Sequence, residues 1–137
     1  MKSIFLKGLF VISIFLMHNC NAQLDTLNYL KTFEANKANY IGKPLSFLLD
    51  NMIQIQPKTI WKVPLHGIRR YVSESVFSYK EKSPFVNENV IFFTIIWKQR
   101  IPYSDVEYYE KKNHFLFTVE ERSFYGNKVI KDIKINQ

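Results

Sequence analysis

The sequence has few of the residues that build covalent or metal-bound frameworks. Its 137 residues include one cysteine, three histidines and four glycines. One cysteine cannot form a disulfide within the chain, and a zinc site needs several cysteine or histidine ligands at close spacing. No two glycines are close enough to form a loop around a phosphate group. We therefore predict a domain without metal or cofactor, held together by apolar packing, for which a hydrophobic share of 47% supplies the material.

A short apolar run lies near the N-terminus. It extends from Gly8 to Met17 behind Lys2 and Lys7. As a helix it would be about 15 Å long, half of the roughly 30 Å of a bilayer's hydrocarbon core. Small residues follow at the spacing typical of a signal peptidase site. The first 22 residues are therefore predicted to be a secretory signal peptide, removed after Ala22 so that the mature chain begins at Gln23.

The cysteine supports an alternative fate for the same segment. Cys20 lies directly behind the apolar run, which resembles a bacterial lipobox, where the cysteine receives a lipid. A lipobox usually has leucine, a small residue and then glycine, alanine or serine ahead of the cysteine, whereas this chain has Met17, His18 and Asn19. We therefore favour free export, to the periplasm or the medium. The alternative is a lipid-tethered protein of the cell envelope, anchored at Cys20.

The size and charge of the mature chain indicate one mildly basic domain. Removal of 22 residues leaves 115, so a single globular domain is predicted over residues 23–137. Loss of Lys2 and Lys7 lowers the formal net charge from +7 to +5, a balance that attracts anionic surfaces. The basic residues are scattered along the sequence and do not form a stripe, so no binding to nucleic acid is predicted.

Two helices are predicted in the first part of this domain. Asp25 is suited to cap a helix over residues 26–39, in which apolar residues recur at roughly helical spacing. A second helix is expected to begin at Pro44, because proline fits the first turn of a helix. The apolar residues behind it follow the cleanest helical template in the chain: Leu45, Leu48, Leu49 and Met52. Together the two helices predict a helical hairpin.

The remaining residues alternate between strand and helix signals. Runs rich in β-branched and aromatic residues predict strands over residues 53–57, 59–63, 68–80, 90–98, 114–119 and 128–135. The run 90–98 is apolar on both faces and is expected to be the central strand. Capping boxes beginning at Ser104 and Thr118 predict short helices that end near Lys112 and Gly126. The predicted fold class is α+β, with the N-terminal helical hairpin packed on a mainly antiparallel sheet of about four to six strands with short inserted helices.

No catalytic motif is assembled in the sequence. The patterns GxSxG and HExxH are absent, and the two histidines of the mature chain are far apart. The glutamates of the predicted short helices are expected to be solvated and to stabilise those helices: Glu107, Glu110, Glu120 and Glu121. The alternative is a small secreted hydrolase with a site assembled from distant residues, such as His66 or His114 with Glu120 or Asp105.

The strongest binding signal is the stretch TIWKVPLHGIRRY, residues 59–71. Around a Pro and Gly turn it places five side chains suited to contacting a ligand: Trp61, His66, Arg69, Arg70 and Tyr71. The competing interpretation, which we favour, is that Trp61 fills the core and the arginines extend into solvent. Without a catalytic set, the sequence predicts an exported binding protein, not an enzyme. Its expected partner is a protein or an anionic glycan of the cell envelope.

Overall fold

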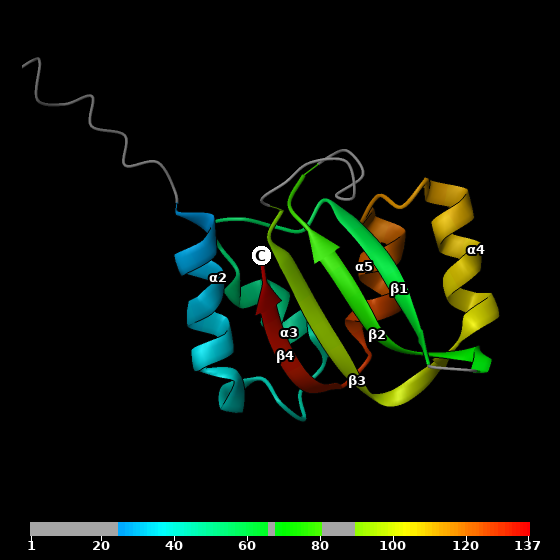
Figure 1. Cartoon of the computed structure of the whole chain (residues 1–137), viewed down its shortest axis with the longest axis horizontal. Coiled ribbons are helices and arrows are strands. Elements are labelled where there is room, and N and C mark those ends of the chain that lie inside the picture. Colours follow the sequence, from blue (N-terminus) through cyan, green and yellow to red (C-terminus); the bar gives the residue numbers. More distant parts are fainter. Residues whose placement is uncertain (1–24, 66–67, 81–89) are drawn as a thin grey trace, which may run out of the picture.

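The fold is α+β, as predicted. A computed structural model describes residues 25–65, 68–80 and 90–137. In chain order the elements are α2 (Thr26–Ala35), η2 (Lys37–Asn39), α3 (Leu45–Asn51), β1 (Thr59–Leu65), β2 (Ile68–Ser78), β3 (Phe92–Pro102), α4 (Tyr103–Asn113), α5 (Val119–Gly126) and β4 (Ile130–Asn136) (Figure 1). The predicted signal peptide and its cleavage or lipidation residues, Cys20, Ala22 and Gln23, lie outside the described residues. No helix among these elements is long and apolar enough to cross a membrane.

The four strands form one antiparallel sheet in the order β1-β2-β3-β4. The connection from β3 to β4 holds α4 and α5, so the short helices are inserted between the last two strands. Figure 1 shows α3 and α5 behind the sheet, α2 beside β4 and α4 beside β1. One cross-strand row of the helix-covered face consists of Ile60, Phe77, Phe93 and Ile135. The helices complete the core with Leu30, Leu45, Leu48, Leu49, Val106 and Tyr125.

Two predicted strands are wrong. Residues 114–119 do not form a strand, because His114 and Phe115 have positive φ angles of 51° and 64°, which turn the backbone out of an extended path. Only Leu116 forms an isolated bridge, to Thr59 at the edge of β1. Residues 53–57 are not a strand either, because Gln56 folds back and its side-chain amide donates to the carbonyl oxygen of Leu49 at 2.9 Å. This segment therefore caps the end of α3.

The predicted beginnings of three helices are confirmed, and the predicted cap of the fourth is wrong. Asp25 caps α2 by accepting from the backbone N–H of Asn28 at 3.1 Å, and α3 begins directly after Pro44. The capping box of Thr118 is present at the start of α5. Ser104 does not cap α4, because Pro102 occupies the cap position and Ser104 lies inside the first turn.

The expected N-terminal hairpin is not confirmed as a packing unit. The helix predicted over residues 26–39 ends at Ala35, and a short 3₁₀ turn, η2, follows it. α2 contacts mainly β4, whereas α3 contacts mainly α5. The two helices therefore join the domain through different partners.

A β-bulge explains why the apolar pattern of β4 is irregular. Ile96 pairs with Asp132, but the next residue of β3, Trp97, pairs with Ile130, so Lys131 has no direct partner. The extra residue shifts the parity of the strand. As a result Ile130 and Ile133 both lie in the core, while Lys131 is exposed.

Side chains and a loop cover the outer edges of the sheet. On β1, the backbone N–H of Lys62 donates to Glu110 Oε1 at 2.8 Å and that of Ile60 donates to the carbonyl oxygen of Phe115 at 2.9 Å. On β4, the backbone N–H of Ile135 donates to Glu34 Oε1 at 3.0 Å. Unpaired edge donors are a template for adding a strand from another chain. Covering them makes strand addition a poor route for partner binding.

Candidate functional site

The predicted binding stretch is divided between β1 and β2. Trp61 of β1 is half-buried, and its ring stacks on Phe115 with the centroids 4.1 Å apart and the planes 12° apart. Arg70 and Tyr71 are exposed at the beginning of β2. His66 and the side chain of Arg69 lie outside the described part of the chain.

The sheet register keeps the described members of this stretch apart. Trp61 lies opposite Val76, whereas Tyr71 lies opposite Pro102, near the other end of β2. Val76 and Tyr71 are five residues apart on one strand, which is about 17 Å. The structure therefore does not bring Trp61 and Tyr71 into one small contact site.

Of the residues of the alternative hydrolase site, Asp105 and His114 lie at opposite ends of α4. Asp105 lies in the first turn of α4 and His114 follows its last residue, so nine residues of helical rise, about 13 Å, separate them. The carboxylate of Glu120 is held by Lys112 at 2.7 Å and by Asn113 at 3.1 Å. Over residues 25–65, 68–80 and 90–137, no cluster of three His, Cys, Asp or Glu side chains could hold a metal ion.

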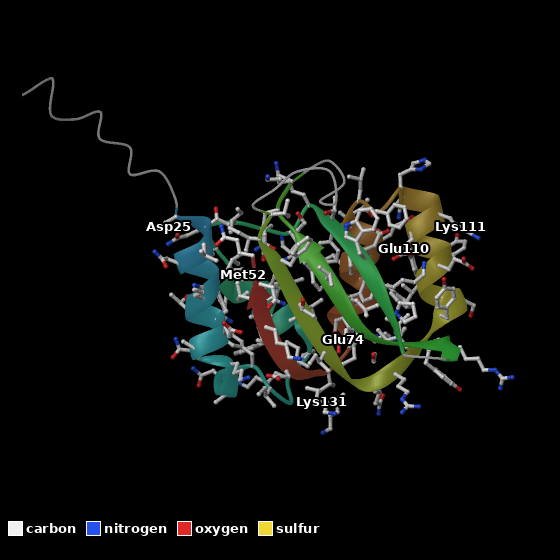
Figure 2. The ribbon with its side chains drawn as sticks, in the orientation of Figure 1. Asp25, Met52, Glu74, Glu110, Lys111 and Lys131 are labelled. Carbon is white, nitrogen blue, oxygen red and sulfur yellow. The ribbon has the colours of Figure 1, made fainter. Side chains whose placement is uncertain are left out.

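Glu110 corrects the expectation that the helix glutamates are solvated. Its side chain is 3% exposed, and it accepts from both the backbone N–H and the ammonium group of Lys62. The Lys62 ammonium also lies 4.8 Å from the ring centroid of Tyr103. Figure 2 shows Glu110 on the side of α4 that faces β1, with the neighbouring Lys111 on the outer side. The carboxylate therefore joins α4 to the edge of the sheet.

Glu121 is a second buried carboxylate, at the start of α5. It accepts from the backbone N–H of Thr118 at 3.0 Å and from the side-chain amide of Asn113 at 2.7 Å. Burial raises the pKa of Tyr125, and the charges of Glu110 and Glu121 raise it further. Both glutamates hold elements of the fold together through these hydrogen bonds. Glu107 and Glu120 are the two that reach solvent.

A cleft of about 380 Å³ lies between α4 and α5. Its walls are Tyr108, Tyr109, Lys112, Val119, Glu120, Ser123 and Phe124. Two of these side chains are unusually exposed for their type: Tyr108 is 58% exposed and Val119 is 82% exposed. Exposed apolar side chains gathered around a hollow are a mark of a binding surface.

The aromatic floor of the cleft is fixed to the core. The ring centroids of Tyr109 and Phe124 are 4.7 Å apart, and those of Phe124 and Tyr125 are 4.9 Å apart in an edge arrangement. Tyr125 is buried and stacks on Trp97, whose indole N–H donates to Ser75 Oγ at 3.0 Å. A floor held this way loses little side-chain freedom when it binds a ligand.

An ion pair borders the cleft at the end where α4 stops and α5 begins. Lys112 Nζ lies 2.7 Å from Glu120 Oε1 and 5.7 Å from the ring centroid of Tyr108. The hydrogen bond from Lys112 holds the pKa of Glu120 below its usual range, with help from Asn113, and it raises the pKa of Lys112. Both groups are therefore charged at neutral pH, and their charges cancel locally.

The sequence offered only a weak signal for this cleft. Tyr108 and Lys112 are four residues apart and therefore share one helix face, but this pattern is also typical of an ordinary solvent-exposed helix surface. Val119 belongs to two overlapping predictions, the strand over residues 114–119 and the helix that begins at Thr118, and the structure confirms the helix. The order Thr118-Val119, with an apolar residue directly behind a capping threonine, was the available clue.

In comparisons with protein-family models, curated proteins and solved structures, no match to this chain was found.

Proposed function

We propose that this chain is an exported, non-enzymatic binding protein that engages a protein partner through the cleft between α4 and α5. The observation that carries the proposal is the pair of exposed side chains, Tyr108 and Val119, beside a preformed aromatic floor. Tyrosine is enriched among the residues that dominate binding energy at protein interfaces. A charged pair at the border supplies the polar rim that such interfaces have.

The chemistry of the cleft favours a protein over an anionic glycan as its ligand. Glu120 neutralises the one cation of the cleft walls, Lys112, so an anion entering there would also meet a carboxylate. An apolar or aromatic side chain of a partner would instead bury the ring of Tyr108 and the methyl groups of Val119. Burial of such surface is worth roughly 25 cal/mol per Å² before the costs of association.

Export is part of the proposal, because it defines where the partner is found. Mass spectrometry of the native protein gives its N-terminus: a chain beginning at Gln23 supports free export. A diacylglyceryl group on Cys20 would replace it with the lipid-tethered alternative, and an intact Met1 in the cytosol would contradict export altogether.

The test of the cleft uses site-specific photo-crosslinking in the producing cell. A photoreactive amino acid at Val119 should give one dominant protein adduct. The same amino acid at Ile53, which is 85% exposed next to α3, should give none. Equal adducts at both positions would contradict the proposal.

Affinity for the partner identified in this way gives a second readout. Tyr108→Ala should weaken binding roughly 30-fold, the usual effect of removing a hot-spot side chain. Tyr71→Ala is the matched control, since this tyrosine is 41% exposed on β2. A larger loss with Tyr71→Ala than with Tyr108→Ala would move the contact surface to the stretch around residues 59–71.

A further inference from the structure

Ion pairing is unevenly distributed over the molecule. The pairs Lys62–Glu110, Lys111–Glu107 and Lys112–Glu120 all involve α4. Among the described basic side chains that have no acidic partner, five belong to segments that meet at one end of the sheet: Lys43, Lys98, Arg100, Lys128 and Lys131. We call this group the basic end. All of its members are exposed except Lys128, which is half-buried.

Backbone hydrogen bonds place the basic end at one end of the sheet. The N–H of Lys98 donates to the carbonyl oxygen of Val129 at 2.9 Å, which joins the last part of β3 to the residues just before β4. The turn around Lys43 lies on the other side of the same segment, because Ile130 donates to the Lys43 carbonyl oxygen at 2.9 Å. Figure 2 shows Lys131 at this lower end of the molecule.

Acidic side chains do little to neutralise this surface. Asp132 follows Lys131 in the chain, but its carboxylate is already bound by Lys37 at 2.7 Å. Glu74, labelled near the same end in Figure 2, can offset one charge of the group. The basic end therefore keeps a clear excess of positive charge, and most of the positive charge of α4 is paired.

Apolar side chains lie next to these cations. Lys43 Nζ lies 4.1 Å from the ring centroid of Phe47, and Phe47 and Ile41 are 40% and 41% exposed. Lysines beside exposed aliphatic and aromatic side chains are typical of surfaces that rest on a lipid headgroup layer. A hydrated polysaccharide would use the charges but would gain nothing from Ile41. The combination therefore favours a bilayer.

We propose that the basic end docks the protein on a bilayer surface rich in anionic phospholipid. Each lysine near such a surface strengthens binding about fivefold. At the basic end, β3 leads into the start of α4, and the end of α5 leads into β4 (Figure 1). Lys112 lies near the end of α4 and Glu120 near the start of α5, so this ion pair lies at the opposite end of the two helices. Docking would then place Lys112 and Glu120 farther from the membrane than Phe124, over whose ring Lys128 Nζ lies at 4.8 Å.

The experiment measures sedimentation of the native, exported protein with vesicles. One set contains phosphatidylcholine alone, and the other contains about one third phosphatidylglycerol. Binding should be stronger to the anionic set, and this excess should be lost between about 0.05 M and about 0.3 M sodium chloride, because salt screens surface charge. Any contribution of an N-terminal lipid is the same for both sets and cancels in the comparison.

Charge variants locate the contact. The double variant Lys98→Gln/Lys131→Gln should bind anionic vesicles roughly 25-fold more weakly. The control Lys80→Gln/Lys111→Gln removes the same charge from the segment just after the last residue of β2 and from α4, and should bind nearly as the native protein does. Circular dichroism and thermal unfolding verify that both variants fold. Equal losses in the two variants, or no binding to anionic vesicles at low salt, would overturn the proposal.

A soluble polyanion separates the bilayer from a glycan. Ile41→Ser should weaken binding to anionic vesicles and leave binding to dextran sulfate unchanged. If dextran sulfate binds in a Lys98- and Lys131-dependent manner while the vesicles do not, the surface binds an acidic polymer and the bilayer proposal is wrong.

Discussion

Replacing Glu110 by leucine should be among the most damaging single changes in this protein. Its carboxylate is 3% exposed and accepts from the ammonium group and the backbone N–H of Lys62, whose side chain is 15% exposed. Removing one partner of a buried ion pair typically costs about 3–5 kcal/mol, because the other charge stays buried without compensation. A domain of this size has a free energy of unfolding of about 5–15 kcal/mol, so the loss is a large share of the total.

A double-mutant cycle separates the pair from the packing around it. Lys62→Met alone should cost about 3 kcal/mol, because it leaves the carboxylate buried without its cation. The double variant Lys62→Met/Glu110→Leu should cost only about 1–3 kcal/mol, the price of one edge N–H without an acceptor. The coupling free energy between the two positions should therefore exceed about 2 kcal/mol.

The assay is equilibrium unfolding in urea. Variants are compared only if the slope of the free energy of unfolding against urea concentration, the m-value, is the same for each. Glu107→Gln is the matched control. Glu107 lies on the same helix as Glu110, and its carboxylate pairs at 3.3 Å with Lys111, whose side chain is 75% exposed. Its cost should be below about 0.5 kcal/mol. A cost below about 1 kcal/mol for Glu110→Leu, or single costs that simply add up to that of the double variant, would refute the reasoning.

Three further predictions concern local structure and pH. Gly42→Ala should lower the free energy of unfolding by about 1 kcal/mol in the same urea assay. The cost comes from the backbone, because Gly42 has a φ of 81° and nothing lies within 4 Å of the added methyl group. The control Gly126→Ala in α5 should be close to neutral. Thr118→Ala should cost about 1–2 kcal/mol by removing the cap of α5, and hydrogen exchange should increase in the first turn of that helix and little elsewhere. The hydrogen bond from Lys37 lowers the pKa of Asp132, so this pair stabilises the protein above the unfolded-state pKa of about 3.9 and ceases to do so as the pH falls through the folded-state pKa. Lys37→Met should therefore raise the Asp132 pKa in an NMR titration; an unchanged pKa would show that the pair does not form in solution.

Local signals were reliable where a few neighbouring residues decide the structure. Asp25 and Thr118 cap helices because their side chains reach backbone donors two or three positions ahead. Most of the run 90–98 lies in β3, which spans Phe92–Pro102 and is an interior strand, because the run is apolar on both faces. Ser104 does not cap α4, because Pro102 provides the extended residue from which the helix begins.

Signals that depend on distant partners were missed. Glu110 shares a face of α4 with Val106, four residues before it, but only the edge of β1 supplies the donors that allow a carboxylate to be buried there. The segment 114–119 has strand composition, yet it turns at His114 and Phe115 and follows the edge of β1 for one bridge only. Its composition reflects packing against Trp61 and Phe77.

The amino-acid sequence by itself determined the α+β class, the positions of most elements and the apolar core, because propensity, capping and hydrophobic periodicity act over a few residues. Only the tertiary structure decided which surface has the means to bind. The antiparallel register separates Trp61 from Tyr71, the pairing of α4 with α5 joins Tyr108 to Val119, and the crossing of three chain segments gathers Lys43, Lys98 and Lys131. Contacts of this kind join residues far apart in the chain, and no short-range pattern encodes them.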